Sequence, residues 1–597
     1  MKRLVLDLGV VVFGTTCWAQ VTQRVSLDSS GAQAAGESLV PSISADGRYV
    51  AFASSAANLV PGDVNHSTDV FVRDRQTGTT VCASVDPNGA PGLVASFTPA
   101  ISANGRYVAF ASYAGNLVPG DDNFRSDVFV RDLQTGTTER VSVDSNGVQG
   151  NDSSGLDSCP AISADGRYVA FSSVASNLVP GDTNSFEDTF VRDRLLGTTE
   201  RVSVDSAGAE ANYGSGRDPA MSTDGRFVAF ASWSTNLVPG DTGWIADVFV
   251  HDRLVGTTER VSVDTAGVQG NDDSEDPSIS PDGRYVVFES DATNLVAVDN
   301  NGAIDVFLRD RLLATTELVA RDSSGTQGNN RAVDPTISDD GRYVAFTSWS
   351  SNLVDGDTNG AWDDFVRDRV LGITERTSVD SSGAGGNTRS LAGSISADGR
   401  YVAFRSYAVN LVPGDTNGVS DVFVRDRAHA GFANLCDPGV AGVIACPCSN
   451  PPSGPGRGCD NSSGTGGASL AASGGEYLSS DSVVFTTSGG KPTALHVVLQ
   501  GVGSLPAGAI YGQGVRCVAG SLKRLYAKAA VAGSITAPDF GAGDATVHAR
   551  SAALGDVIAA GSTRWYMVFY RDPTVLGGCS ASSTFNTTQT RELLWQP

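Results

Sequence analysis

The chain has 597 residues, which is long enough for two to four domains with large buried cores. Its formal net charge is −24. An acidic surface argues against nucleic acid as a partner, because phosphate binding needs basic patches. Glycine (69 residues) and proline (24 residues) are frequent, but they fall at turns between patterned segments, so the composition does not predict disorder.

Residues 1–19 have the features of an export signal. Lys2 and Arg3 precede an apolar run at residues 4–13, and Cys17 and Ala19 offer small side chains at the positions that flank a cleavage point. No other stretch approaches the ~18 apolar residues that are needed to span a bilayer. We therefore expect an exported protein, periplasmic, cell-surface or extracellular, with no transmembrane span in the mature chain.

One phrase, Ala-Asp-Gly-Arg-Tyr-Val-Ala-Phe at residues 45–52, occurs in seven nearly identical copies. The glycines of the copies are Gly47, Gly105, Gly166, Gly225, Gly283, Gly341 and Gly399. A period of about 58 residues with strand-like content predicts a repeat architecture, with one supersecondary unit per copy.

Residues 158–205 illustrate the strands expected in one unit. Residues 160–163, 168–172, 188–193 and 200–205 alternate or cluster apolar side chains, and Gly-containing turns separate them. Four short antiparallel strands per unit, repeated around a ring, predict the blades of a β-propeller.

The strand count predicts how the ring closes. Seven units supply the first three strands, but the seventh ends at residue 427 without a fourth. Residues 23–28, Gln-Arg-Val-Ser-Leu-Asp, match the fourth strand at residues 200–205, Glu-Arg-Val-Ser-Val-Asp. We therefore expect the N-terminal strand to complete the last of seven blades and to leave no open edge.

The repeated phrase Pro-x-Ile-Ser-x-Asp-Gly-Arg-Tyr-Val-Ala-Phe, followed by Asp-Val-Phe-Val-Arg-Asp, resembles the TolB-like, WD40-like propeller repeat of exported bacterial proteins. The resemblance covers residues 21–428. The α/β domain that precedes the propeller in TolB has no counterpart here, and the blades are longer. The resemblance therefore implies the fold rather than the role or partners of TolB.

Strand alternation places the long loops on one face of the predicted disc, and binding sites usually lie on such loops. Aromatic residues recur there and could stack on a sugar or hold a peptide. The alternative is that they fill the gaps between diverging blades. The candidate ligand-binding residues are Tyr113, Trp233, Trp349, Tyr407, Phe124, Trp244 and Trp362, and Phe186 lies at an equivalent place.

The pattern Asp-x-Asn-x-x-x-Asp recurs in the same loops, and clustered oxygen ligands suit Ca²⁺ in a structural role. The pattern lacks the later bidentate Glu of an EF-hand, and the alternative is an Asx turn. The candidate metal ligands are Asp63, Asn65, Asp69, Asp121, Asn123, Asp127, Asp182, Asn184, Asp188, Asp299, Asn301, Asp305, Asp357, Asn359, Asp363, Asp415, Asn417 and Asp421. In the fourth unit Gly243 replaces the Asn.

Two observations bear on catalysis. The predicted propeller has only two histidines, His66 and His251, in unrelated units, and the pentapeptide Gly-x-Ser-x-Gly is absent. The repeated Arg of Asp-Gly-Arg and the Arg-Asp at the end of the third strand are expected to form ion pairs within each blade. No catalytic residue is therefore predicted, although paired carboxylates remain an alternative in so acidic a chain.

The C-terminal third differs in composition. Residues 429–475 are rich in Cys, Gly, Pro and Ser and predict a connector, and strand-like runs follow at residues 482–487, 495–499, 514–518, 522–528, 545–550, 565–571 and 592–595. Short strands with Gly turns predict a β-sandwich over residues 476–597. Residues 513–520 and 565–573 look like a C-terminal module of other exported bacterial proteins, which could anchor or display the propeller.

The cysteines of this third predict disulfides. An even set in an exported, Gly-rich segment suggests up to three disulfide bonds with open pairing, whereas a zinc site at Cys446-Pro447-Cys448 is the alternative. The candidates are Cys436, Cys446, Cys448, Cys459, Cys517 and Cys579. Cys82 and Cys159 stand alone in the repeats and are expected to be buried.

Together these features predict an all-β, exported, monomeric and non-catalytic binding or scaffold protein. Its seven-bladed propeller would present one long-loop face to a protein or glycan at the cell envelope or outside the cell. No cofactor is expected to be required, and Ca²⁺ is a candidate structural ion. The alternative is a polysaccharide hydrolase or lyase. A catalytic propeller should show an acid or His group that is unique to one or two blades and clustered at the central channel.

Overall fold

The computed structural model describes residues 20–427, other than 157 and 217, and several later segments. The later segments are 433–434, 459, 462–463, 468–473, 483–511, 514–539, 543–558, 562–572, 585–588 and 591–594. Residues 20–427 form one compact unit, and the later segments belong to a second. The expected signal peptide lies outside the described residues, and no described helix is both long and apolar enough to cross a membrane.

Residues 20–427 contain seven four-stranded antiparallel sheets, numbered here in chain order. The first three are β2–β5 (Ser38–Ile43, Tyr49–Ser54, Asp69–Asp74, Thr79–Cys82), β6–β9 (Ser96–Ile101, Tyr107–Ser112, Asp127–Asp132, Thr137–Arg140) and β10–β13 (Ala161–Ile162, Tyr168–Ser173, Asp188–Asp193, Thr198–Arg201). The fourth and fifth are β14–β17 (Ala220–Met221, Phe227–Ser232, Asp247–Asp252, Thr257–Arg260) and β18–β21 (Ser274–Ile279, Tyr285–Ser290, Asp305–Asp310, Thr315–Leu318). The sixth and seventh are β22–β25 (Ala332–Ile337, Tyr343–Ser348, Asp363–Asp368, Ile373–Arg376) and β26–β28 (Ser390–Ile395, Tyr401–Ser406, Asp421–Asp426) with β1 (Val21–Arg24).

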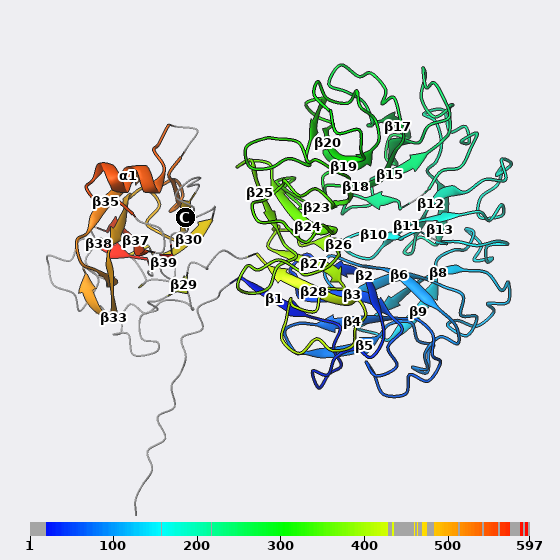
Figure 1. Ribbon diagram of the computed structural model, residues 1–597, viewed down its shortest axis with the longest axis horizontal. Coiled ribbons are helices and arrows are strands. Elements are labelled where there is room, and N and C mark those ends of the chain that lie inside the picture. The colour runs from blue at the N-terminus through cyan, green and yellow to red at the C-terminus, as the bar shows by residue number, and fades with distance from the viewer. Residues whose placement is uncertain are drawn as a thin grey trace, which may run out of the picture. The chain divides into compact units, whose positions relative to one another are not determined.

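The first strands of the sheets, which we call the inner strands, contact one another in chain order, and β26 of the seventh sheet contacts β2 of the first. The sheets therefore follow one another around a closed ring, blue through green to yellow in Figure 1. This is the arrangement of a β-propeller.

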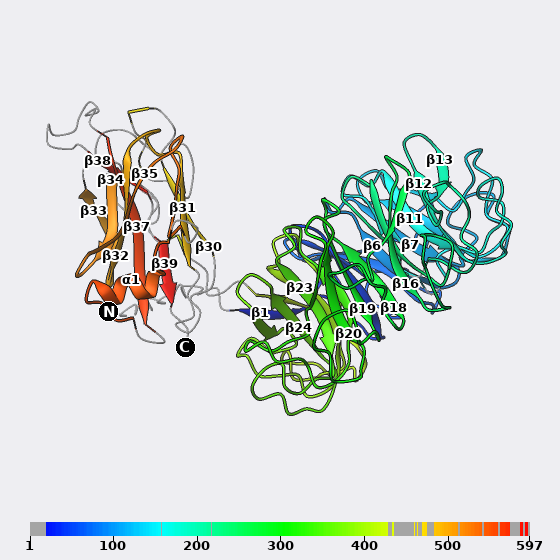
Figure 2. The ribbon, with the colours of Figure 1, turned by 90° about the horizontal axis from the view of Figure 1, so that it is seen from above.

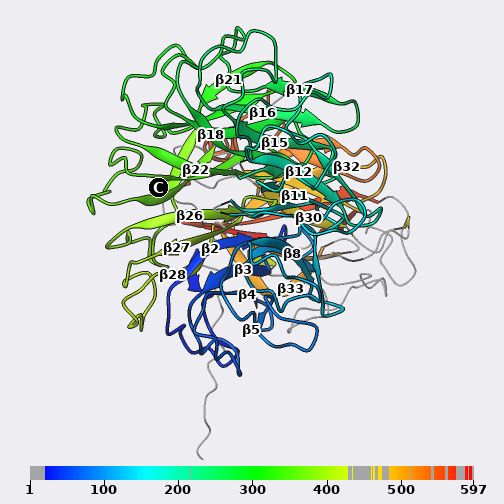
Figure 3. The ribbon, with the colours of Figure 1, turned by 90° about the vertical axis from the view of Figure 1, so that its right-hand side faces the viewer.

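The N-terminal strand completes the seventh sheet. β1 pairs antiparallel with β28, with Val21 opposite Asp426 and Arg24 opposite Phe423. Figure 3 shows the blue first sheet beside the yellow-green seventh. The sequence predicts this pairing, although the strand lies at residues 21–24 rather than 23–28 because the following residues turn away into a loop.

Each repeated turn binds its sheet to a neighbour. Gly47 has a φ of 70°, and a Cβ added there would lie 2.1 Å from the ring of Tyr401 in the seventh sheet. Only glycine allows this approach. Arg48 binds Asp74 through two contacts of 2.9 and 2.6 Å, and the Arg75 guanidinium lies 4.5 Å from the Tyr401 ring centre. The predicted ion pairs within each sheet are therefore confirmed, and the repeated Gly, Arg and Tyr hold neighbouring sheets together.

The strand bounds also define two unequal sets of loops. Residues 44–48 and 75–78 are short turns on one face, whereas residues 55–68 and 83–95 are long loops on the other. The same division recurs in the other sheets. We call the second face the long-loop face.

The second unit contains two packed antiparallel layers, seen edge-on in Figure 2. One sheet has β29 (Ala433–Asn434), β39 (Arg591–Leu594), β37 (Thr563–Arg571), β32 (Leu495–Gly501), β35 (Lys523–Ala529) and β38 (Phe585–Thr587). The other has β30 (Ser469–Ser473), β31 (Val484–Ser488) and β36 (Ile535–Ala537), and β33 (Gly503–Tyr511) pairs with β34 (Gly514–Ala519). The Phe485 and Tyr566 rings, 4.7 Å apart, join the two layers.

Two expectations for this unit need correction. The strand expected at residues 545–550 is helix α1 (Val547–Ala553) instead, because Thr546 caps it by accepting a hydrogen bond from the Ala549 N–H and alanines favour the helix. Strands β29 and β30 lie within the range expected as a connector. Of the predicted disulfide cysteines, Cys459 is buried, while Cys436, Cys446, Cys448, Cys579 and the Cys517 side chain lie outside the described residues.

Candidate functional site in the central channel

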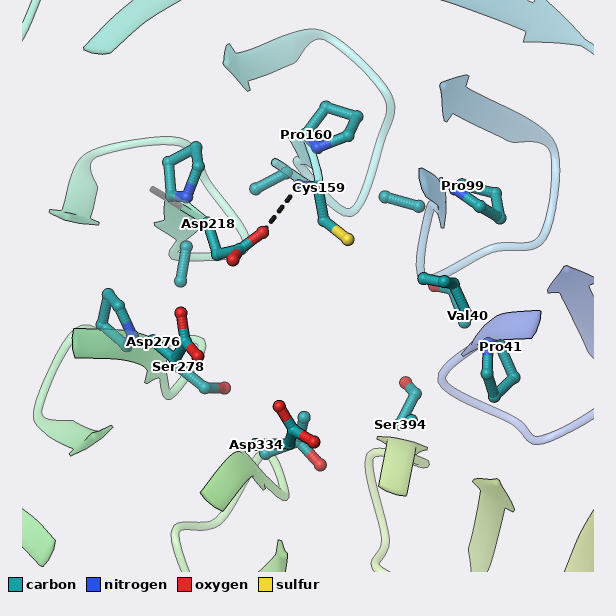
Figure 4. Close-up of a pocket in the computed structure, with 18 of the residues that line it drawn as sticks. Val40, Pro41, Pro99, Cys159, Pro160, Asp218, Asp276, Ser278, Asp334 and Ser394 are labelled. Atoms are coloured by element: carbon teal, nitrogen blue, oxygen red, sulfur yellow. Dashed lines mark hydrogen bonds between the residues drawn. The ribbon is translucent and has the colours of Figure 1, made fainter. Parts of the chain in front are cut away.

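The inner strands carry an unusual backbone conformation at the residue before their proline. Val40, Asp218, Asp276 and Asp334 have φ values between 42 and 53° there, a region that residues other than glycine seldom adopt. The strand register shifts at this point in the first, fifth and sixth sheets, which marks a β-bulge. The bulge directs the side chain of this residue toward the centre of the ring, as Figure 4 shows.

The inner strands enclose a cavity of about 450 Å³. The bulge position changes from sheet to sheet around it: Val40, Thr98, Cys159, Asp218, Asp276, Asp334 and Ala392. Acidic side chains therefore come from three consecutive sheets, and Val40 and Pro99 lie on the opposite side (Figure 4). The channel is chemically one-sided although the scaffold repeats.

Three carboxylates meet on the acidic side. Asp276, Glu289 and Asp334 each place an oxygen within 4.8 Å of the other two. Glu289 also accepts a hydrogen bond of 3.0 Å from the Asp334 N–H, so the fifth sheet contacts the bulge of the sixth. We call these three residues the channel triad.

Burial and mutual repulsion shift protonation in the triad. Burial, followed by the charge of Asp276, raises the pKa of Glu289 from 4.5 to about 8. Burial and Asp276 likewise raise the pKa of Asp334 to about 6, against the opposing charge of Arg405. At neutral pH Glu289 therefore holds a proton beside a carboxylate, an arrangement that suits a hydrogen-bond donor and acceptor side by side.

Further unusual side chains surround the triad. Asp364 is buried where other sheets have Val or Thr, and its Oδ2 has no hydrogen-bond partner among the described residues. Burial raises the pKa of Asp364. Arg405 lines the cavity from the seventh sheet, and its charge opposes the rise in the pKa of Asp334. Cys159 donates its backbone N–H to Asp218 at 2.7 Å (Figure 4), and burial raises the pKa of its thiol.

The triad lies toward the long-loop face. Asp276 and Asp334 are the third residues of β18 and β22, strands that begin at this face. Glu289 is the last residue but one of β19, which ends there. A ligand on the long-loop face could therefore reach the acidic side of the channel.

The predicted aromatic residues are mostly exposed on that face. Phe124 is 94% exposed, Trp244 70%, Trp349 46% and Tyr113 41%, so these four do not simply fill gaps between sheets. Trp233, Trp362 and Tyr407 are half-buried. Trp362 stacks on Trp349 at 5.8 Å, and the Tyr407 hydroxyl donates to Glu37 at 2.5 Å.

One aromatic group includes a residue that the sequence analysis missed. Tyr213 lies 4.3 Å from the ring of Phe186 and 5.6 Å from that of Trp244. All three side chains are at least 38% exposed. Their sequence positions are unrelated, because Tyr213 precedes an inner strand while the others lie in loops between second and third strands. We call this group the aromatic patch.

The residues predicted as calcium ligands come together in each loop, but the chain supplies their partners. Each predicted Asn donates to the last Asp of its motif, as Asn65 does to Asp69 at 2.6 Å, and Asn65 also accepts from the Ser67 N–H. In several sheets an Arg lies between the two acids of the motif, as Arg140 lies between Asp121 and Asp127. The Asx-turn geometry is therefore present, and calcium binding stays a prediction.

Two groups of three described acids are close enough to hold a metal ion: Asp182, Asp188 and Glu210, and the channel triad. Arg201 already contacts the first group at 2.8 to 3.6 Å. On the triad, the charge of Arg405 opposes the rise in the pKa of Asp334. The sequence does carry a signal for the triad: Glu289 and Arg405 stand where the other repeats have Ala, Ser or Thr, and Asp364 stands where they have Val or Thr.

The chain matches no protein-family model and no curated protein. Among solved structures it resembles an oligogalacturonate lyase from Vibrio parahaemolyticus, with 12% identity and a TM-score of 0.40 over 68% of this chain and 90% of that one. It also resembles TolB from Acinetobacter baumannii (16% identity, TM-score 0.31, 60% and 76% covered) and an acylaminoacyl peptidase from Pyrococcus horikoshii (11%, 0.39, 66% and 51%). At these values no inference about function rests on the likeness.

Proposed function

We propose that this protein is an exported binding protein whose seven-bladed propeller holds a glycan on the long-loop face, over the acidic side of the channel. The observation that carries the proposal is the restriction of Asp218, Asp276 and Asp334 to three consecutive sheets. A structural role would repeat in every sheet, as the Arg48–Asp74 pair does, whereas a ligand needs unlike groups in one place.

The aromatic patch supports a sugar as the ligand. Phe186 and Trp244 lie in loops of the third and fourth sheets, and Tyr213 lies between them. Exposed aromatic faces stack on the apolar faces of sugar rings, and a few polar groups nearby fix orientation. The fourth sheet also contributes Asp218 to the channel, so both features occur in neighbouring sheets.

The charge of the channel narrows the class of glycan. The described cavity is lined by Asp218, Asp276 and Asp334, and Glu289 adjoins the last two. Arg405 is the one cationic side chain in this lining. Moving an anionic sugar next to these groups would be repulsive. We therefore propose a neutral or amino-bearing glycan. The second unit would then attach or display the propeller, stapled by the cysteines that the sequence predicts.

A polysaccharide hydrolase or lyase is the second candidate, and one observation favours it. Glu289, with its pKa near 8, adjoins Asp276 and Asp334. A protonated carboxylic acid beside a carboxylate is the pair that glycoside hydrolysis uses for proton donation and for nucleophilic or base assistance. This acid group comes from only two sheets and lies at the central channel, as expected of a catalytic propeller.

The test measures binding and turnover on the same samples. Calorimetry with chito-oligosaccharides, neutral β-glucan oligosaccharides and oligogalacturonates is expected to show binding of the first or second class only. The variants Trp244→Ala and Asp334→Asn should weaken binding at least tenfold, whereas Val255→Ala, an exposed residue of a short turn, should not.

Reducing-end and unsaturated-product assays separate the two candidates. Binding without product in either assay supports the binding protein. Product that disappears in Glu289→Gln, with binding retained, would establish the enzyme instead. Binding that is unaffected by Trp244→Ala and Asp334→Asn together would remove this face as the site.

A further inference from the structure

The loop acids of six sheets receive an internal donor. We call the first and last Asp of each loop motif the loop acid pair. In five sheets an Arg nitrogen lies 3.0 to 3.6 Å from both members of the pair. These arginines are Arg24, Arg140, Arg201, Arg260 and Arg376. A guanidinium is thus the normal occupant of the space between the two carboxylates.

The fifth sheet shows that a second donor can replace the Arg. Leu318 stands at the Arg position there, opposite Phe307. The Gln327 side-chain amide instead donates to Asp299 at 2.7 Å and to Asp305 at 2.8 Å. The pair in this sheet therefore still receives hydrogen bonds from within the chain.

The first sheet lacks both donors. Cys82 is opposite Phe71 in the register, where Arg140 is opposite Phe129 in the second sheet. Pro91 forms the loop bridge that a Gln forms in the fifth sheet. Cys is shorter than Arg by the guanidinium and the adjoining methylene, and Pro has no donor. Among the described residues, the pair Asp63 and Asp69 thus has neither the Arg nor the Gln donor that the other six sheets supply.

The consequence is visible at Asp63. Its side chain is 7% exposed, and its buried Oδ1 has no hydrogen-bond partner among the described residues. The equivalent Oδ1 of Asp121 lies 3.1 Å from an Arg140 nitrogen, and that of Asp241 lies 3.0 Å from an Arg260 nitrogen. The unpartnered oxygen therefore points to where the guanidinium lies in other sheets. Burial raises the pKa of Asp69 to about 6.

We propose that the first sheet is a binding site for a guanidinium group from outside the chain, namely an arginine side chain, between Asp63 and Asp69. A guanidinium is planar and carries several N–H donors, so it can bind the two carboxylates at the same time. The entry would lie beside Gly62, which is exposed. Its counterpart Gly120 accepts the other Arg140 nitrogen through its carbonyl at 3.2 Å.

A metal ion fits this position less well. The groups of three described metal-ligating side chains within 4.8 Å of one another lie elsewhere. A metal ion here would have only two carboxylate ligands. Cys82 and His66 lie nearby, since the charge of His66 lowers the pKa of Asp63 and the charge of Asp63 contributes to the raised pKa of Cys82. A guanidinium needs no third carboxylate, because five sheets bind one with the same two acids.

Thermal unfolding of the full chain tests the proposal with N-acetyl-arginine methylamide as the free probe and Gly-Arg-Gly as the peptide probe. We expect both to raise the melting temperature by 1 °C or more, with saturation in the millimolar range, because a ligand of the native state alone stabilises it. The neutral isostere N-acetyl-citrulline methylamide should have no effect. A response to the peptide alone would assign the site to a partner chain's arginine.

Matched variants locate the effect. Cys82→Arg should raise the melting temperature without probe and abolish the response, and Asp63→Asn should abolish the response whether or not Cys82→Arg folds. Arg140→Cys combined with Gln149→Pro recreates the gap in the second sheet, so the probe should restore part of the stability lost there. A shift that persists in Asp63→Asn, an equal shift with citrulline, or a response to Ca²⁺ but not to arginine would overturn the proposal.

Discussion

The loop acid pairs and the channel triad are both clusters of carboxylates in one repeated scaffold, but their charges are compensated in different ways. The loop pair Asp121 and Asp127 has Arg140 between its members. In the channel triad Glu289 instead retains its proton. Acids that repeat with the scaffold thus receive an Arg or Gln donor from it in six of the seven sheets, whereas the acids of the triad gather where the repeat is broken. The predictions below test that distinction.

The largest effect is expected from removing an internal cation. Arg140→Ala leaves Asp121 and Asp127 buried without their ion pair, and breaking a buried pair typically costs about 3 kcal/mol. Urea unfolding monitored by tryptophan fluorescence should show this loss. The matched change Arg125→Ala removes a pair with Asp152 that is more than 40% exposed on both side chains, and it should cost under about 1 kcal/mol. Equal losses would contradict the distinction.

Removing a carboxylate from the triad should raise stability rather than lower it, and the gain should depend on pH. The folded pKa of Glu289, about 8, lies above its ordinary value of 4.5, so the folded state binds the extra proton between these values. Stability therefore falls as pH rises from 4.5 to 8. Glu289→Gln removes this loss and should stabilise the protein by about 2 kcal/mol at pH 8.5 and very little at pH 4.

Unfolding midpoints across this pH range, with Glu259→Gln as the control, measure the effect. Glu259 has a half-exposed side chain that pairs with Arg311, so its replacement should not produce the same pH profile. A Glu289→Gln variant that is less stable than the parent at pH 8.5 would show that the carboxylate is neutralised in a way that the contacts described above do not include.

A smaller gain is expected at Asp364, behind the triad. Five of the seven sheets have Val at this place, and the Oδ2 of Asp364 lacks a partner among the described residues. Asp364→Val should therefore raise stability by about 1 kcal/mol, since it removes a buried polar group at the cost of the hydrogen bond that the Thr347 hydroxyl donates to it. If the variant also loses glycan binding, the acid serves the site rather than the fold.

The sequence predicts the ring well because the ring is made of repetition. The Gly47 turn, the Arg48–Asp74 pair and the joining of residues 21–24 to β28 are all local or periodic signals. The channel triad is different, since Asp276, Glu289 and Asp334 become neighbours only when two sheets pack side by side. Their proximity depends on a β-bulge before proline, and no particular residue type marks that bulge in the sequence.

The aromatic patch shows the same limit. Trp244 is visible as an aromatic residue in a long loop, but Tyr213 enters from a different loop and joins Phe186 and Trp244 only in three dimensions. In the second unit, residues 545–550 look like a strand because they alternate, yet Thr546 and the following alanines form helix α1. The N-cap at Thr546 therefore determines the secondary structure of this segment, and the alternation of its residues does not.

The smallest effect is expected from removing calcium. The predicted calcium ligands have Arg or Gln donors in every predicted loop but that of Asp63 and Asp69, so a cation would have to displace groups that are already bonded. Excess EDTA should therefore lower the melting temperature of the oxidised protein by less than about 1 °C, since only a ligand bound to the native state stabilises it. A large drop that calcium reverses would instead establish the loops as ion sites. Repeating the measurement on Asp63→Asn and Asp121→Asn would then show whether the ion binds where the internal donor is missing or where it is present.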